Sequence, residues 1–260
     1  MTRVQLLSRV RAGLTALMFL FLTGCASTGE FADPRDPWEG FNRGVFSFND
    51  SLDKAIIKPL AKGYKAVVPV PLDRGITNFF SNLGDIGSAI NNALQFKLSR
   101  AGSDLGRVVV NTTLGLLGFF DVATNMNLPH YDEDFGQTLG VWGSSPGPYI
   151  VLPLLGPSSG RDAVGLVVDW FTDPVNYIED DTIRIALRAL WIIDRRADLL
   201  SASNLVEQAA LDPYEFVRNA YLQKRRYAVH DGNPPPESDD EELLESDEEQ
   251  PESEEGQPEK

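Results

Sequence analysis

The sequence predicts an all-α protein, and three observations lead to that prediction. Apolar residues recur at intervals of three and four in several segments, which is the spacing of one face of an α-helix. Typical helix-start residues precede most of these segments. No segment shows the sustained alternation of apolar and polar residues that indicates a half-buried strand.

The N-terminal region has the features of an export signal. Arginines precede the apolar run Leu14–Leu22, which has the length of a signal core and is too short to span a bilayer. The following Leu22-Thr23-Gly24-Cys25 is similar to the bacterial lipobox, in which a peptidase cuts before a cysteine that is then diacylated. Cys25 is the only cysteine, so the chain cannot form an internal disulfide. We expect residues 1–24 to be removed and Cys25 to be lipidated.

The residue after Cys25 bears on location. By resemblance to the sorting rule of diderm bacteria, an Asp there favours retention in the inner membrane. The chain has Ala26 instead, which points to the outer membrane. Two or three acyl chains anchor a protein firmly where one does not. Residues 25–35 are then a lipidated tether ahead of the folded domain.

The first predicted helix begins at Asp36-Pro37-Trp38-Glu39, with Asp36 as N-cap and Glu39 reaching back to it. It is rich in aromatic residues, so it suits a membrane interface or an ordinary core equally well. Its apolar stripe consists of Phe41, Val45, Phe48, Leu52 and Ile56.

Two further helices are predicted before residue 120. One begins at Asp73, and Ser103 is the expected cap of the other, which passes through 108–111. No segment after Cys25 contains eighteen consecutive apolar residues. The mature protein is therefore not expected to cross a bilayer with a single long helix.

The stretch Phe135–Gly160 is the least usual part of the chain, because it is apolar, has no charged residue and is rich in Gly and Pro. Dense prolines remove backbone donors and forbid a continuous helix or a central strand. Such a segment is either a buried loop in an ordinary core or a hairpin that lines a pocket or pore. We expect an irregular hairpin, most crowded at Gly143 and Gly147.

The remaining helices are predicted from stronger signals. Ser159-x-x-Asp162 is a capping box, residues 182–200 are amphipathic, and Asp212-Pro213 starts a last helix that ends at Lys224-Arg225-Arg226. We expect these three cations to be solvated at the helix end, with contact to anionic headgroups as the alternative. Residues 229–260 are predicted to be a disordered acidic tail, since 231–260 hold 14 acidic residues and one lysine of a chain whose net charge is −15.

Two short motifs suggest a catalytic site and a metal site, but the neighbouring residues argue against both. Gly143-Ser144-Ser145-Pro146-Gly147 matches the serine-hydrolase elbow, but the residue after the candidate nucleophile is Pro146, which has no N–H for an oxyanion hole. His130, Asp132, Glu133 and Asp134 are four potential metal ligands, but so close in sequence that we expect a solvated loop. The near-neutral body gives no basic face for nucleic acid. We expect no enzyme activity, cofactor or metal.

Several motifs together resemble the MlaA (VacJ) lipoprotein family. They follow the family's order over about residues 25–228, and the acidic tail lies outside them. The matching segments are Asp36-Pro37-Trp38-Glu39-Gly40-Phe41-Asn42-Arg43, Asn111-Thr112-Thr113-Leu114-Gly115, Phe135-Gly136-Gln137-Thr138-Leu139-Gly140, Gly147-Pro148-Tyr149 and Asp212-Pro213-Tyr214.

The resemblance implies a fold, an activity and partners. Members form a ring of amphipathic helices in the inner leaflet of the outer membrane around a central amphipathic channel. They remove phospholipids misplaced in the outer leaflet, pass them to a soluble periplasmic carrier and associate with trimeric porins. The helical domain would cover residues 36–228. A different hypothesis is a structural envelope lipoprotein that braces a porin without moving lipid.

The hypothesis of a lipid channel gives a set of candidate residues. They come from the first helix and from the uncharged hairpin. They are Phe48, Asn49, Leu139, Gly140, Trp142, Gly143, Gly147, Tyr149 and Leu152.

Overall fold

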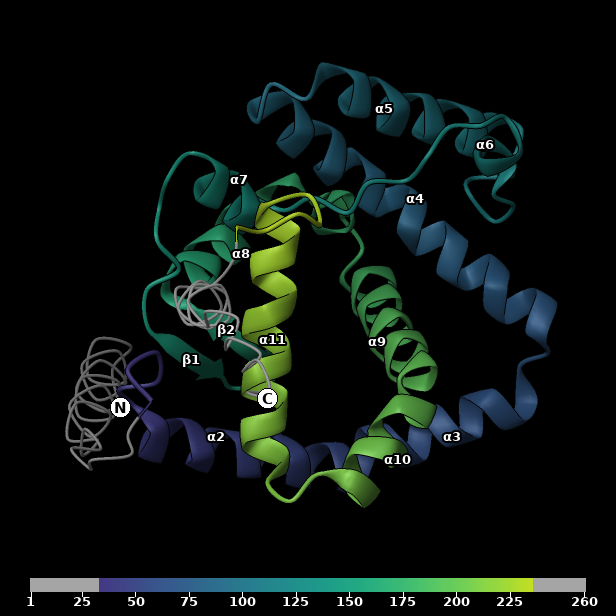
Figure 1. Ribbon diagram of the computed structural model, residues 1–260. Coiled ribbons are helices and arrows are strands. Elements are labelled where there is room, and N and C mark those ends of the chain that lie inside the picture. The colour runs from purple at the N-terminus through teal and green to yellow at the C-terminus, as the bar shows by residue number, and fades with distance from the viewer. Residues whose placement is uncertain (1–32, 236–260) are drawn as a thin grey trace, which may run out of the picture.

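The structure is a computed structural model that describes residues 33–235. Residues 1–32 and 236–260, which include Cys25 and most of the acidic tail, lie outside the described part of the chain. The described chain is mainly helical, which confirms the predicted fold class. Figure 1 shows the helices arranged as a ring-like frame rather than as a bundle.

One side of the frame is a long rod made of three consecutive elements, α2 (Glu39–Leu52), the π-helix η1 (Asp53–Ile57) and α3 (Lys58–Val67). The long helix α4 (Val70–Leu94) turns back from the rod, and α5 (Leu98–Thr113) packs on it (Figure 1). The short α6 (Val122–Asn125) follows. The wider i→i+5 hydrogen bonding of η1 was not anticipated from the sequence.

The other side of the frame holds α7 (Phe135–Val141), the strands β1 (Tyr149–Leu152) and β2 (Gly156–Ser159), and α8 (Gly160–Thr172). The short helix η2 (Pro174–Tyr177) leads to α9 (Asp181–Asp198), which packs against α3 and α4. Finally α10 (Leu200–Ala209) connects to α11 (Pro213–Val229), which runs back towards α7 and α8 (Figure 1).

The predicted hairpin at residues 135–160 is present, but the expectation that it would be irregular was wrong. The segment contains α7 and an antiparallel pair of strands in which Val151 lies opposite Pro157. Proline is excluded from central strands because it has no N–H, but a strand in a two-stranded sheet has one free edge where that loss is harmless. Four-residue strands are also too short for an alternating pattern to be recognised.

Two predicted helix caps were also wrong, and both residues serve tertiary contacts. The carboxylate of Asp36 does not cap α2; it is buried and accepts hydrogen bonds from Asn42, Tyr214 and Arg218. Ser103 lies inside α5, where its hydroxyl donates to the carbonyl of Pro129. A short polar side chain can bond distant groups as well as local ones.

The other two caps are confirmed. The hydroxyl of Ser159 accepts from the N–H of Asp162 at the start of α8, and Asp212 accepts from the N–H groups of Tyr214 and Glu215 at the start of α11. Both are the interactions expected of N-cap residues.

The expected domain limits also change at both ends. The carbonyl of Arg35, assigned to the tether, accepts from the N–H of Tyr149 at 2.7 Å. Asp231, assigned to the tail, pairs with Lys97 and Arg100. The folded domain therefore includes residues 33–35 and 229–235.

Candidate functional site

The distribution of side chains in this fold is the reverse of that in an ordinary soluble domain. No Leu, Ile, Phe, Met or Trp in the described chain is fully buried. The buried apolar residues are ten, mostly Ala and Tyr, against 21 buried polar or charged residues. Because large aliphatic and aromatic residues normally fill a core, their consistent exposure here means that the perimeter faces something other than water alone.

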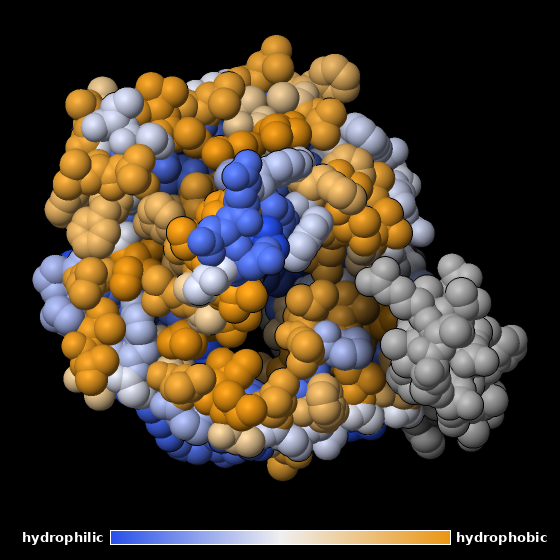
Figure 2. All heavy atoms as spheres, turned by 180° about the vertical axis from the view of Figure 1, so that it is seen from behind, coloured by the Kyte–Doolittle hydropathy of each residue, from blue (hydrophilic) through white to orange (hydrophobic). Residues whose placement is uncertain are grey.

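The exposed apolar residues are spread over most of the helices. Figure 2 shows that they cover much of one face of the molecule and surround a hollow near its centre. Exposed apolar patches of this extent mark contact with a membrane or a partner. Within residues 33–235, no helix is long and apolar enough to pass through a bilayer.

The hairpin is attached to the frame by two asparagines of α2, spaced seven residues apart. Asn42 donates to the carbonyl of Tyr149 (3.1 Å) and accepts from the N–H of Val151 (2.9 Å). Asn49 donates to the carbonyl of Leu152 (3.0 Å) and accepts from the N–H of Leu154 (2.8 Å). A side-chain amide carries one donor group and one acceptor, as the backbone does. The two amides therefore satisfy the edge of β1 in place of a third strand.

A buried polar cluster holds the other end of β1. Tyr149 is fully buried against Tyr214 of α11. The hydroxyl of Tyr214 donates to Asp36 at 2.5 Å, and Arg218 also donates to Asp36. Burial, and secondarily the charge of Asp36, raise the pKa of Tyr149 to about 12. The cluster joins the N-terminal segment, the hairpin and α11 into one unit.

A second cluster joins α7, α8 and α11 through Arg225. Its guanidinium donates to both carboxylates, Asp134 before α7 and Asp162 in α8. Burial opposes ionisation of Asp162, but the charge of Arg225 and the hydroxyl of Tyr221 keep its pKa below the ordinary value. The expectation that Arg225 is a solvated helix-end cation was wrong, because α11 continues past it to Val229.

The glycine at position 136 makes this second cluster possible. A Cβ atom on Gly136 would lie 2.6 Å from Asp162 Oδ1 and 2.8 Å from Arg225 Nη2. The first glycine of the Phe-Gly-Gln-Thr-Leu-Gly motif is thus required by a buried ion pair. Gly140, the second, is similarly close to Arg161 and Val229.

The predicted channel residues form two separate groups. In the first, Asn49 contacts Leu152 through its amide, and Phe48 is its exposed neighbour on α2. Tyr149 is buried at the start of β1, three residues before Leu152. In the second, Leu139 and Gly140 lie in α7 and Trp142 follows it, half exposed, donating to the carbonyl of Leu94. Within residues 33–235, no hydrogen bond or ring contact joins the two groups.

The hairpin glycines 143 and 147 adopt φ values of +93° and +67°, which favour glycine. The expected crowding there was wrong. A Cβ on Gly143 would meet nothing within 4 Å, and one on Gly147 would come no closer than 3.8 Å to Gly160. These glycines are needed for backbone conformation rather than for space.

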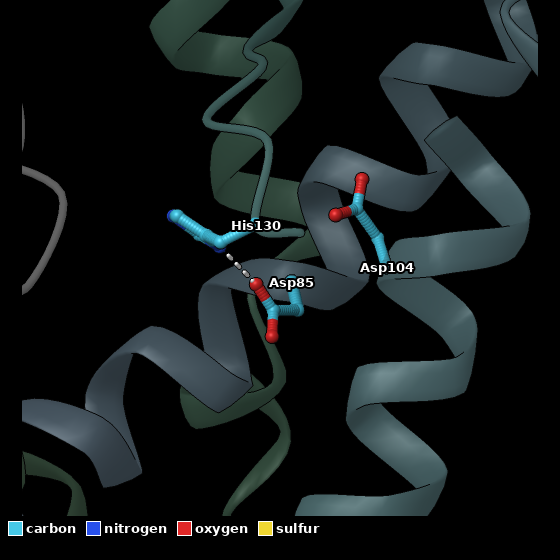
Figure 3. Close-up of side chains that lie close together, drawn as sticks. All are labelled: Asp85, Asp104 and His130. Atoms are coloured by element: carbon cyan, nitrogen blue, oxygen red, sulfur yellow. Dashed lines mark hydrogen bonds and ion pairs between the residues drawn. The ribbon is translucent and has the colours of Figure 1, made fainter. Parts of the chain in front are cut away.

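The expectation of a solvated loop at 130–134 holds only in part: His130 and Asp132 are exposed, but Glu133 and Asp134 are drawn into ion pairs. Glu133 is buried and pairs with Lys97, while Asp134 binds Arg225. His130 instead donates to or accepts from Asp85 of α4 at 2.6 Å, and Asp104 of α5 lies beside them (Figure 3).

The group Asp85, Asp104 and His130 has the donor types of a metal site, with one atom of each within 4.8 Å of the others. Arg107 already occupies one oxygen of Asp85 at 3.1 Å. Burial raises the pKa of Asp104 to about 6, and the bond to Asp85 raises the pKa of His130. The arrangement is therefore a network of hydrogen bonds and ion pairs around two buried aspartates, in which the bond to Asp85 favours the charged form of the partly exposed His130.

Sequence reasoning missed the residues that hold the site together: Asn42, Asp36, Arg218 and Arg225. Asn42 lies within the motif Asp36–Arg43, and an asparagine on a helical face was the available signal. Its partners on β1 are more than a hundred positions away in sequence, so no local pattern could identify them.

An apolar perimeter around a polar interior, preceded by a predicted acylated cysteine, defines a membrane-associated lipoprotein. A family model described as MlaA lipoprotein matches residues 34–228. The chain belongs to the MlaA lipoprotein family, and the resemblance found in the sequence is confirmed.

Individual proteins that are similar to this chain include named members of the same family. The chain is 35% identical to the Escherichia coli protein "Intermembrane phospholipid transport system lipoprotein MlaA" over 234 residues, covering 88% of this chain and 92% of the relative. It is 33% identical to the Haemophilus influenzae protein of the same name, covering 84% and 90%. An uncharacterised Rickettsia felis protein is 36% identical over 75% of this chain and 78% of the relative.

A solved structure described as "Structural basis for maintenance of bacterial outer membrane lipid asymmetry" has the same fold. The TM-score is 0.66 at 35% sequence identity, and the match covers 75% of this chain and 98% of the solved one.

Proposed function

We propose that this protein is an outer-membrane lipoprotein that removes mislocalised phospholipids from the outer leaflet and passes them to a soluble periplasmic carrier, so that lipid asymmetry is maintained. It lies in the inner leaflet on the periplasmic side, anchored through Cys25, beside a trimeric porin. Its relatives named for intermembrane phospholipid transport support this role.

The observation that carries the proposal is the reversed distribution of side chains. A perimeter of exposed Leu, Ile, Phe and Trp suits acyl chains of the leaflet, because burying apolar surface in lipid releases it from water. The hollow in Figure 2, which has hydrophobic residues around most of it and hydrophilic residues on one side, suits an amphiphile, because a headgroup is costly to place in hydrocarbon. A lipid that crosses such a ring keeps both of its ends in matching surroundings.

The decisive experiment compares intact cells with and without the protein. A phospholipase added from outside releases lysophospholipid only when phospholipid is present in the outer leaflet. We expect release to rise severalfold when the protein is removed and to return to the original level when it is restored. A clean outer leaflet together with a weakened envelope in the depleted cells would favour the structural, porin-bracing alternative.

The part of the hairpin in this function is tested at Gly143 and Gly147. Valine at either position disfavours the positive φ, so Gly143→Val and Gly147→Val should raise phospholipid in the outer leaflet without changing lipidation. Gly84→Val is the matched control, because Gly84 lies in α4 with nothing within 4 Å of a Cβ. Normal lipid removal by both hairpin variants would place the conduit elsewhere.

A further inference from the structure

Arg161 at the start of α8 is a nearly buried cation that pairs with Asp162 through Nε and lines a pocket with the rest of its side chain. Its side chain is only 5% exposed, and Nε donates to Asp162 Oδ1 at 2.9 Å. Among residues 33–235, no hydrogen bond from its terminal nitrogens Nη1 and Nη2 is present. Neither nitrogen is among the fully buried side-chain atoms that lack a partner, and Arg161 is part of a pocket wall, so this end of the guanidinium is accessible from the pocket.

The neighbouring carboxylates are already hydrogen-bonded. Asp162 already accepts from four donors: the Nε atom of Arg161, two nitrogens of Arg225 and the hydroxyl of Tyr221. Asp134 is bound in bidentate fashion by Arg225. The cluster of Arg161, Arg225, Asp134 and Asp162 is formally neutral, and its two carboxylates already accept from several donors.

Arg161 lines a pocket of about 610 Å³ between α11, β2 and the start of α8. This volume lies within the range of small-molecule sites. Apolar side chains of α11, including Phe216, Leu222 and Val229, form part of its wall, and Arg35 and Arg226 add positive charge to the lining. The pocket therefore combines a cationic anchor with an apolar wall.

We propose that this pocket binds the phosphate of a phospholipid, with Arg161 as the anchoring cation. The inference rests on the proposed function and specifies a subsite for it. A guanidinium presents two parallel N–H groups that match two phosphate oxygens, a geometry that lysine cannot reproduce. The volume accommodates the headgroup and glycerol, and the acyl chains extend along the wall and out of the pocket.

A carboxylate of the chain's own acidic tail is the competing occupant. Residues 236–260 are strongly acidic, but Leu243 and Leu244 are their only large apolar residues. An amphiphile uses both the cation and the apolar wall, whereas a highly charged peptide uses mainly the first. The structure therefore favours the lipid phosphate, and the experiment includes the tail as a separate outcome.

The test measures binding of dihexanoyl phosphatidylglycerol to the purified full-length lipoprotein in a neutral detergent, by calorimetry. Dihexanoylglycerol, which lacks the phosphate, is the matched probe. We expect Arg161→Gln to weaken binding of the phospholipid at least tenfold, Arg161→Lys to restore part of it, and neither to change binding of the phosphate-free probe. Arg195→Gln is the control variant; Arg195 is an exposed arginine of α9, stacked on Trp191.

Three results would overturn the proposal. In the first, Arg161→Gln binds the phospholipid as the original protein does. In the second, Arg195→Gln loses as much affinity, so that the effect is one of general charge. In the third, the full-length protein does not bind the phospholipid and a variant that lacks residues 236–260 does, which would make the tail the occupant. Circular dichroism tests whether Arg161→Gln is folded. If it is unfolded, Arg161→Lys is compared with the original protein instead.

Failure of this site can be told apart from failure of the proposed function. If the full chain binds the phospholipid through Arg161 but depleted cells have a clean outer leaflet, the subsite is real and the transport role is wrong. If depleted cells accumulate outer-leaflet phospholipid but Arg161→Gln binds normally, only the subsite is wrong.

Discussion

At the scale of single residues, the fold depends on small residues and amides that let charged groups approach. Two helices approach closely where Gly165 of α8 meets Gly136 of α7: a Cβ on Gly165 would lie 2.5 Å from the N atom of Gly136. That atom belongs to the backbone, so it cannot move aside as the end of a flexible side chain can. The crossing of α7 and α8 therefore requires glycine.

Gly165→Ala should destabilise the protein by about 1–3 kcal/mol, the range for overpacking a tight contact. Gly102→Ala is the matched control, because Gly102 is also helical but a Cβ there would meet nothing within 4 Å. It should stabilise α5 by up to about 1 kcal/mol, since alanine is the better helix former. Denaturant unfolding in detergent measures both. Equal behaviour of the two variants would show that the α7–α8 contact is looser than described.

His130 makes stability depend on pH. The hydrogen bond to Asp85 raises the pKa of His130 above 6.5, against the smaller opposing effect of burial; Arg107 also faces the pair, and Asp104 lies on the other side. The stabilisation is therefore complete below pH 6.5 and is lost as pH rises through the folded-state pKa.

We expect His130→Gln to lower the melting temperature most near pH 5.5 and least near pH 8.5. The comparison is made at each pH against the original protein, because Asp104, whose pKa is raised to about 6, titrates in both. A difference between the two proteins that stays constant across this range would contradict the ion pair.

At the scale of elements, the hairpin is stable because α2 completes it. A two-stranded sheet is marginal in water by itself, and here the edge of β1 is paired with Asn42 and Asn49. Tyr149 and Val151 form an apolar cluster with Tyr214 of α11. The hairpin is thus held between α2 and α11, at the centre of the contacts that close the ring.

Asn49→Ala should loosen the β1–β2 turn, since the carbonyl of Leu152 and the N–H of Leu154 would each lose a partner. We expect a loss of about 1–3 kcal/mol and faster hydrogen exchange at Leu154. Asn125→Ala is the control, because Asn125 makes only an exposed bond to Asp121. Unchanged exchange at Leu154 would show that the turn is held by other contacts.

At the scale of the whole molecule, the ring presents apolar surface outward and polar groups inward, and no helix of residues 33–235 could span a bilayer. The predicted acylation at Cys25 lies outside the described residues and remains a prediction.

Cys25→Ser should abolish incorporation of a fatty-acid probe, because no other cysteine is present. The unlipidated protein should be lost from the outer-membrane fraction. Metabolic labelling and fractionation measure both, with Gly84→Val as a variant expected to be labelled normally. Label retained by Cys25→Ser would exclude this residue as the acylation site.

The sequence by itself determined the helical class, the family and the starts of some helices, because periodicity, caps and motifs are local properties. Ser159 and Asp212 cap helices as predicted, since their partners lie within three residues. Only the tertiary structure determined the hydrogen-bond and ion-pair partners of Asp36, Asn42, Asn49 and Arg225, because those partners lie far away in sequence. It also decided the hairpin, where two short strands containing Pro157 are stable only because α2 pairs with their edge. Buried charge depends on which distant groups meet, and a one-dimensional pattern does not contain that information.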